Sequence, residues 1–165
     1  MSATRIIEGR TTATPPSPTV WYVPAAATEL VSTYLRALAE RDAELAIGLF
    51  ADDGVVHSPL YGPRAPGDFY PALFADTSEA NLTLKSVMTG QDQSGRTVVS
   101  FWFHFGWLLP SGAAAPFDVV DVATIGPDGK IAELHIVYDT VDVRPVFETE
   151  VGHTSWRRSK DQRGA

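Results

Sequence analysis

The chain contains no cysteine, which excludes disulfides, thiolate nucleophiles and thiolate-bound metals. Long hydrophobic runs are also absent, and residues 1–20 lack the apolar stretch of a signal peptide, so we expect no membrane partner and a cytoplasmic protein. Positive charge is scarce, because 13 Lys and Arg stand against 20 Asp and Glu for a net charge of −7. With no basic stripe in the sequence before the C-terminal tail, we expect no nucleic-acid partner.

Several chemical signatures are missing as well. The sequence has no glycine-rich phosphate loop, no GxSxG nucleophile turn and no His, Asp and Glu cluster at metal-binding spacing. A site that joined His57, His104 and Asp121 around a metal would need side chains from both faces of the predicted sheet. We therefore expect neither a metal nor another cofactor.

The length and composition predict one domain with ends of different character. A chain of 165 residues that is 44% hydrophobic can bury a substantial core. Residues 1–20 are rich in Thr, Ser and Pro and are predicted to be a flexible arm, and the domain is placed at 21–148. Residues 149–165 are polar and are predicted to be a flexible tail, in which Trp156 is expected to fray with its neighbours.

The first half of the domain has helical periodicity and the second half is typical of β-structure. Residues 28–41 place apolar side chains at helical spacing, Asp42 is positioned to cap a short helix over 43–50, and residues 67–76 predict a third helix after a short strand. Four β-branched and aromatic runs follow, separated by turn sequences. We predict an α+β domain in which a four-stranded antiparallel meander forms a curved sheet wrapped around the helices.

The strand over residues 96–109 is apolar on both faces. Side chains alternate along a strand, so the aromatic residues at 101, 103, 105 and 107 share one face, while Trp102 and His104 share the other. One face must meet the helices. The second face is too apolar for water, so we expect it to meet another copy of the chain in a homodimer.

Asp121 is the candidate partner of His104. A hairpin through residues 109–116 would place Asp121 opposite either His104 or Trp102, and both registers make Asp121 and His104 neighbours on one face. A carboxylate beside an imidazole among apolar side chains is the setting in which pKa values shift toward neutrality. The sequence predicts a pocket site here, and the alternative is a pair with a structural or surface role.

The segment YLRALAERDAELAIGLFADDGVVHSPLYG, together with the order of elements over residues 25–143, resembles the nuclear transport factor 2-like superfamily, in its ketosteroid isomerase and polyketide-cyclase-like (SnoaL-like) branch. The resemblance implies a cone-shaped α+β barrel, commonly dimeric, with a deep apolar pocket. It implies that Tyr34 and Asp121 occupy the two oxyanion-donor positions of the isomerases. Their general base falls on Ser58, which has no basicity at neutral pH.

Two related branches give other expectations for the same pocket. Matched to limonene epoxide hydrolases, His104 and Trp102 stand where a catalytic aspartate and its arginine partner lie, and Ile136 replaces a third charged group. Scytalone dehydratases use histidines in this pocket, which supports His104 as an acid–base group. In the register of the isomerases, His57 and His135 point away from the pocket.

These observations predict an enzyme that acts on a hydrophobic carbonyl or polyketide- or terpenoid-like small molecule by isomerisation, dehydration or cyclisation. His104 would transfer the proton, Asp121 would tune it, and Tyr34 would polarise an oxygen. The alternatives are a non-catalytic protein that binds a hydrophobic ligand and an epoxide hydrolase-like variant. The residues expected to line the substrate pocket are Ser58, Phe69, Phe74, Met88, Trp102, Ile136 and Tyr138.

Overall fold

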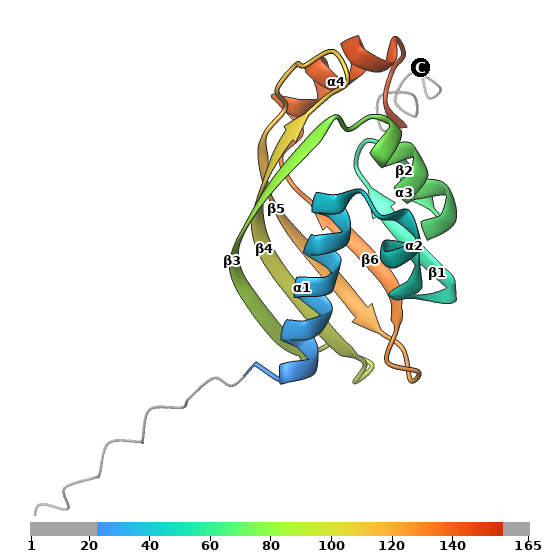
Figure 1. Cartoon of the computed structure of the whole chain (residues 1–165). Helices are drawn as coiled ribbons and strands as arrows, with labels where there is room; N and C mark the ends of the chain where they lie inside the picture. Colours follow the sequence, from blue (N-terminus) through green and yellow to red (C-terminus); the bar gives the residue numbers. More distant parts are fainter. Residues whose placement is uncertain (1–22, 157–165) are drawn as a thin grey trace, which may run out of the picture.

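The computed structural model describes residues 23–156 (Figure 1). The predicted arm at 1–20 and the last part of the predicted tail, 157–165, lie outside the described residues. The described elements, in chain order, are α1 (Ala25–Glu40), α2 (Ala43–Gly48), β1 (Phe50–Ser58), β2 (Gly62–Arg64), α3 (Pro66–Ala75), β3 (Glu79–Gln91), β4 (Thr97–Leu108), β5 (Phe117–Ile125), β6 (Ile131–Val137) and α4 (Val143–Val151).

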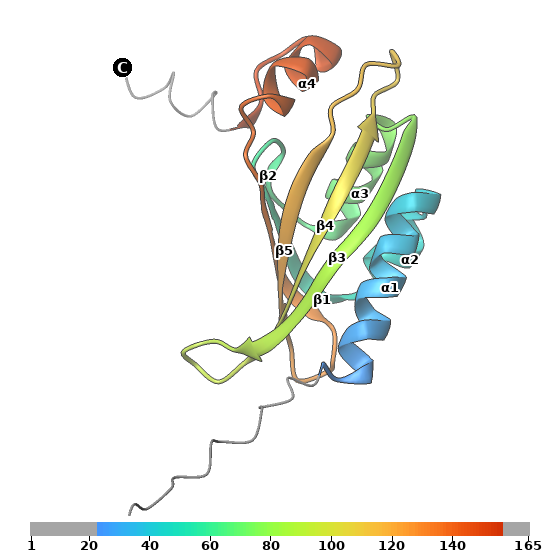
Figure 2. The same ribbon diagram turned by 90° about the vertical axis from the view of Figure 1, so that its left-hand side faces the viewer.

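The strands of residues 23–156 form one curved sheet with the order β2-β1-β6-β5-β4-β3. Strands β3 to β6 form the antiparallel meander that the sequence predicts, while β1 joins β6 in parallel and β2 extends the far edge. Helices α1, α2 and α3 lie on the concave side of this sheet (Figures 1 and 2). The predicted α+β class is confirmed, and the curved sheet does not close on itself.

Helix α1 supplies the helical side of the core. It begins after Pro24, earlier than the N-cap predicted at Thr28, and its buried side chains are Ala27, Val31, Tyr34, Ala37 and Leu38. It ends at Glu40, and the C-cap residue Arg41 adopts a left-handed conformation with φ of 55°. Asp42 then caps α2 as predicted, because its carboxylate accepts a hydrogen bond of 2.9 Å from the Leu45 backbone N–H.

Strand β4 supplies most of the aromatic core. Phe101, Phe103, Phe105 and Trp107 alternate onto the concave face and are all buried. The ring of Tyr34 on α1 packs edge-on against Phe101, with 5.3 Å between ring centroids. The core therefore lies between α1 and β4, and a cavity remains between the sheet and helices α1 and α3.

The C-terminal part of the domain extends beyond the predicted boundary at 148. Helix α4 continues to Val151, and its Phe147 ring stacks on Trp107 with 5.7 Å between centroids. After α4 the chain returns to the domain, where Ser155 is buried and the Trp156 backbone N–H donates a 2.9 Å hydrogen bond to the Leu60 carbonyl. Residues 149–156 thus belong to the packed domain, and α4 covers one end of the cone (Figure 1).

Candidate active site

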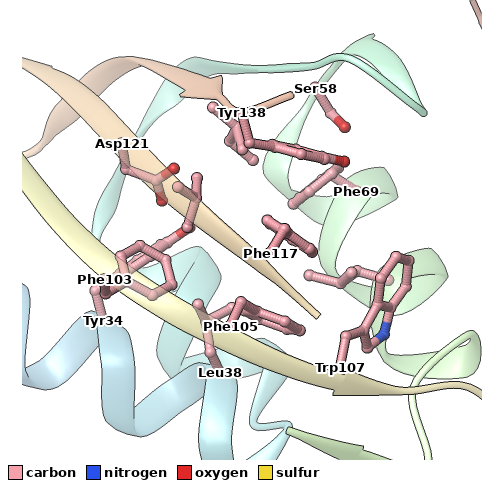
Figure 3. Close-up of a pocket in the computed structure, with 13 residues that line it drawn as sticks. Tyr34, Leu38, Ser58, Phe69, Phe103, Phe105, Trp107, Phe117, Asp121 and Tyr138 are labelled. Carbon is pink, nitrogen blue, oxygen red and sulfur yellow. The ribbon is translucent and has the colours of Figure 1, made fainter. Parts of the chain in front are cut away.

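A small cavity lies between the concave face of the sheet and helices α1 and α3 (Figure 3). Its volume is about 40 Å³, which leaves room for no more than a few water molecules. Aromatic rings fill most of the surrounding space. The cavity is lined by Tyr34, Leu38, Ser58, Phe69, Leu73, Phe103, Phe105, Trp107, Phe117, Val119, Asp121, Ile136 and Tyr138.

Asp121 brings a carboxyl group to this apolar cavity. It pairs with Phe101 on β4 and with Ile136 on β6, so its side chain shares the concave face with the β4 aromatic residues. It is 1% exposed, and its Oδ1 atom has no hydrogen-bond partner among residues 23–156. Burial raises the pKa of Asp121 to about 7, and hydrogen bonding from the Tyr34 hydroxyl opposes part of that increase.

Two tyrosines accompany the carboxyl group. The Tyr34 hydroxyl points toward Asp121 in Figure 3, and the Tyr70 ring on α3 lies 6.3 Å from the Tyr34 ring. Burial, together with the nearby Asp121 carboxyl, raises the pKa of both tyrosines well above the usual value. Both phenols are therefore protonated at neutral pH and are available as hydrogen-bond donors. The Tyr70 hydroxyl, like Asp121 Oδ1, is buried without a partner among the described residues.

Tyr70 is absent from the residues that the sequence predicts for the site. The available signal was a tyrosine within the predicted helix at 67–76, directly after Phe69, where a buried phenol needs a polar neighbour. Helical periodicity does not reveal which face of so short a helix points inward, because the segment is apolar almost throughout.

Ser58 lines the cavity, as the sequence predicts, but its hydroxyl serves the backbone. The Oγ atom accepts hydrogen bonds of 3.3 Å from the backbone N–H groups of Leu60 and Tyr61. These bonds close the turn that follows β1. The position that carries a general base in the isomerases therefore contributes a turn-forming side chain here.

The predicted pair of His104 and Asp121 is wrong. His104 is opposite Asp118 in the β4–β5 ladder, its side chain is 43% exposed on the convex face, and its Nδ1 atom lies 2.8 Å from Asp118 Oδ1. The true register, with Phe101 opposite Asp121, differs by one residue from the nearer register considered above. A shift of one residue moves a side chain to the other face, so Asp121 turns inward while His104 stays outside.

Only some of the other predicted pocket residues line the cavity. Phe69, Ile136 and Tyr138 line the cavity. Phe74 does not reach it and packs behind Tyr70, with 5.9 Å between ring centroids. Trp102 and Met88 are on the convex face and are 42% and 46% exposed, and Trp102 lies beneath the Lys85 ammonium group at 4.6 Å. Because they share the face of His104, the corrected register removes them from the pocket as well.

The lining of the cavity therefore contains one group that titrates near neutral pH, the Asp121 carboxyl. Its other ionisable lining residues are Tyr34 and Tyr138, and burial raises the pKa of both phenols. A metal ion in this cavity would meet one carboxylate and neutral hydroxyls, which is a poor set of ligands. The arrangement is suited to proton transfer and to hydrogen bonding with a substrate oxygen.

A curved, open α+β sheet that holds a buried acid and phenols in an apolar cavity defines the structural class of this protein. The chain belongs to the family of SnoaL-like domains, whose sequence model matches residues 31–134. No match was found among curated protein sequences.

Solved structures share this fold at low sequence identity. One is SalBIII, an epoxide hydrolase/cyclase-like enzyme with a role in pyran ring formation in the polyether salinomycin. It is 20% identical to this chain with a TM-score of 0.57, and the superposition covers 70% of this chain and 92% of SalBIII. TerC, co-crystallised with polyporic acid, is 19% identical with a TM-score of 0.57, covering 75% of this chain and 99% of TerC. A ketosteroid isomerase-like protein from Catenulispora acidiphila, in complex with trimethylamine, is 14% identical with a TM-score of 0.61, covering 76% of this chain and 93% of that protein. These similarities establish the fold.

None of the helices described between residues 23 and 156 has the length and apolar character needed to cross a membrane.

Proposed function

We propose that this protein is an acid–base enzyme that acts on a hydrophobic, carbonyl-containing small molecule, with Asp121 as the group that transfers the proton. The observation that carries the proposal is the Asp121 carboxyl, buried in an aromatic cavity with one oxygen unpartnered among the described residues. Burying a carboxyl group without a full set of hydrogen bonds costs stability, and a container for apolar ligands gains nothing from it. A pKa of about 7 suits a group that must both accept and release a proton.

In the proposed mechanism, ionised Asp121 takes a proton from the carbon next to the substrate carbonyl. The Tyr34 hydroxyl turns from Asp121 to the bound substrate and donates its hydrogen bond to the carbonyl oxygen as negative charge develops there. Return of the same proton to another carbon completes an isomerisation. Departure of a β-hydroxyl group as water, protonated by Asp121 as the C–O bond breaks, completes a dehydration. Attack of the enolate carbon on a second carbonyl of the substrate, whose oxygen takes the proton from Asp121, completes a cyclisation. One carboxyl group suffices for each of these outcomes, and His104 takes no part.

Cyclisation is the outcome that we favour among the three. SalBIII is described as an epoxide hydrolase/cyclase-like enzyme that acts in pyran ring formation, and TerC was co-crystallised with polyporic acid. A polyketide-like substrate is consistent with the aromatic lining of the cavity. Such a substrate needs several hundred Å³, so we expect the aromatic rings that line the cavity to move apart when it binds.

The proposal can be tested without knowing the natural substrate. The protein is incubated in D₂O with a panel of apolar ketones and enones, and NMR follows the exchange of hydrogens next to each carbonyl. We expect Asp121→Asn to slow catalysed exchange by about 10² to 10⁴-fold and Tyr34→Phe by about 10² to 10³-fold.

Asp118→Asn is the matched control, because Asp118 is on the same strand but faces outward. It should leave the exchange rate unchanged, and so should His104→Ala. Equal exchange by the wild type and Asp121→Asn would refute the role of Asp121.

A second function, binding of a hydrophobic ligand without chemistry, is favoured by one observation. Ser58 stands where the isomerases have their base, and its hydroxyl is engaged by the backbone of a turn. Mass spectrometry of ligands released from the purified protein separates the two functions. A ligand recovered unchanged after incubation supports binding, and a ligand converted by the wild type but not by Asp121→Asn supports catalysis.

The epoxide hydrolase-like variant has less support. Matched to the limonene epoxide hydrolases, the positions of their catalytic aspartate and its arginine partner fall on His104 and Trp102. Both of these side chains are on the convex face. The third position falls on Ile136, an apolar residue that lines the cavity.

A further inference from the structure

Two histidines face each other on the convex side of the sheet, away from the Asp121 cavity. His57 on β1 is the register partner of His135 on β6, so the parallel pairing of these strands fixes the two backbones side by side. The imidazole rings stack with 4.2 Å between centroids and 5° between planes. Strands β1 and β6 are distant in sequence, and sheet assembly is what brings this pair together (Figure 1).

A carboxylate completes the group. Glu133 precedes His135 by two residues on β6, so both side chains project from the same face. Glu133 Oε2 lies 3.3 Å from His135 Nε2, and the ligand atoms of His57, Glu133 and His135 all lie within 4.8 Å of one another. Two ligands of a tetrahedral zinc ion, each bound at about 2.0 to 2.1 Å, stand about 3.3 to 3.4 Å apart.

We propose that His57, Glu133 and His135 form a surface site for a first-row divalent cation such as Zn²⁺. Two imidazoles and one carboxylate are donors that zinc and its neighbours in the first row accept readily. Three protein ligands leave a position open for water or another small ligand.

Binding requires one imidazole to turn. The lone pair of an imidazole nitrogen lies in the plane of its ring, so two parallel rings cannot both direct a lone pair at one ion. A hollow of about 360 Å³ adjoins the pair and is lined by both histidines together with Pro63, Val137 and Trp156. This hollow provides space for a ring to rotate about its Cβ–Cγ bond and leaves the open position accessible to solvent.

The surrounding charge leaves one oxygen of Glu133 available. Arg96 Nη1 lies 3.9 Å from Glu133 Oε1, whereas Oε2 is the atom directed at His135. The arginine therefore helps to hold the carboxylate in place, while Oε2 keeps its contact with His135 and would exchange it for the ion. Such outer partners commonly orient the ligands of metal sites.

Calorimetric titration of the untagged full-length chain with Zn²⁺ tests the proposal. We expect one ion per chain, and we expect His57→Ala and His135→Ala each to weaken binding by at least about tenfold, since even outer partners of metal ligands contribute that much. The control is His104→Ala, which removes another half-exposed histidine from the same face. It should bind Zn²⁺ as the wild type does.

Thermal unfolding with and without Zn²⁺ gives a second, independent test of binding. An ion that joins β1 to β6 binds the folded chain alone and should raise the unfolding temperature of the wild type. It should raise that of His57→Ala and Glu133→Gln much less. The proposal is overturned if the wild type shows no saturable Zn²⁺ binding, or if His104→Ala weakens binding as much as His57→Ala does.

Discussion

Two aspartates of β5 experience opposite environments only three residues apart. Asp118 faces outward, where hydrogen bonds from Lys85 and His104 lower its pKa. Asp121 faces the aromatic cavity, where burial raises its pKa to about 7. Strand pairing alone decides which of them meets water, because alternate side chains project from opposite faces. The chemistry of the site is therefore a consequence of register as much as of residue type.

The raised pKa of Asp121 predicts a specific dependence of stability on pH. In the unfolded chain this pKa returns to about 3.8, so between about pH 4 and pH 7 the folded state binds the extra proton. The stabilising contribution is fully present below pH 4 and is lost as the pH rises through 7. Asp121→Asn removes this dependence, so it should gain up to about 4 kcal/mol relative to the wild type between pH 4 and pH 8.

Urea unfolding of both proteins at several pH values measures this difference. Asp118→Asn is the control, because the lowered pKa of Asp118 contributes stability that is lost only as the pH falls below about 3.8, so this variant should follow the pH dependence of the wild type between pH 4 and pH 8. If the difference between wild type and Asp121→Asn stays constant from pH 4 to pH 8, the carboxyl group of Asp121 does not titrate as described.

Among the elements, the β4–β5 hairpin marks the limit of what the sequence predicts. Both strands, and the four-stranded meander as a whole, are predictable from β-branched and aromatic runs between turn sequences. The register is not, because the connection at residues 109–116 is too long for a turn type to fix it and both faces of β4 are apolar. Tyr34 and Asp121 reach the cavity as the resemblance implies, whereas His104, Trp102 and Met88 depend on register and do not.

Helix α4 is not predicted from the sequence, for a different physical reason. Its nine residues include Pro145, and so short a segment has little helical stability by itself. The helix is stabilised instead by docking of Phe147, whose ring contacts Trp107 and Tyr61 with centroid separations of 5.7 and 5.2 Å. Tertiary contacts of this kind cannot be predicted from periodicity.

The packing of Trp156 against β2, where the chain returns to the domain after α4, can be tested by substituting two glycines. Gly62 and Gly95 both have positive φ, at 79° and 81°, but a Cβ atom at Gly62 would lie 2.6 Å from the Trp156 ring, whereas nothing lies within 4 Å at Gly95. Gly95→Ala should cost about 1 to 2 kcal/mol for the left-handed backbone. Gly62→Ala should cost about 1 to 3 kcal/mol more, because the indole must move.

Chemical denaturation of both glycine variants gives the comparison. Equal losses of stability in Gly62→Ala and Gly95→Ala would mean that Trp156 does not pack on β2 in solution.

For the whole molecule, the convex face of the sheet supports the proposal of a homodimer. Trp102 on β4, Val120 on β5 and Val137 on β6 are successive cross-strand neighbours, so they form an apolar row across three strands. Trp102 and Val137 are among the most exposed large apolar side chains of the described residues. An apolar row of this kind on a sheet face is typical of a self-complementary interface.

Sedimentation velocity tests this proposal with a pair of matched variants. Trp102→Glu places a charge in the apolar row and should convert the dimer to a monomer. Val141→Glu adds the same charge at an exposed residue between β6 and α4, away from the row, and should leave the dimer intact. A wild type that sediments as a monomer at micromolar concentration contradicts the proposal.

The parallel pairing of β1 with β6 also constrains how this chain can fold. Among residues 23–156, β1 and β2 reach the remaining strands only through β6, the last strand to be synthesised. During translation α1, α2, β1, β2 and α3 emerge first, so β1 must keep an unpaired edge until β6 has left the ribosome. Such distant pairing slows folding and prolongs the exposure of apolar strands. A nascent chain that stalls before β6 therefore lacks Ile136 and Tyr138 of the cavity wall and leaves the edges of both β1 and β5 unpaired, which favours aggregation.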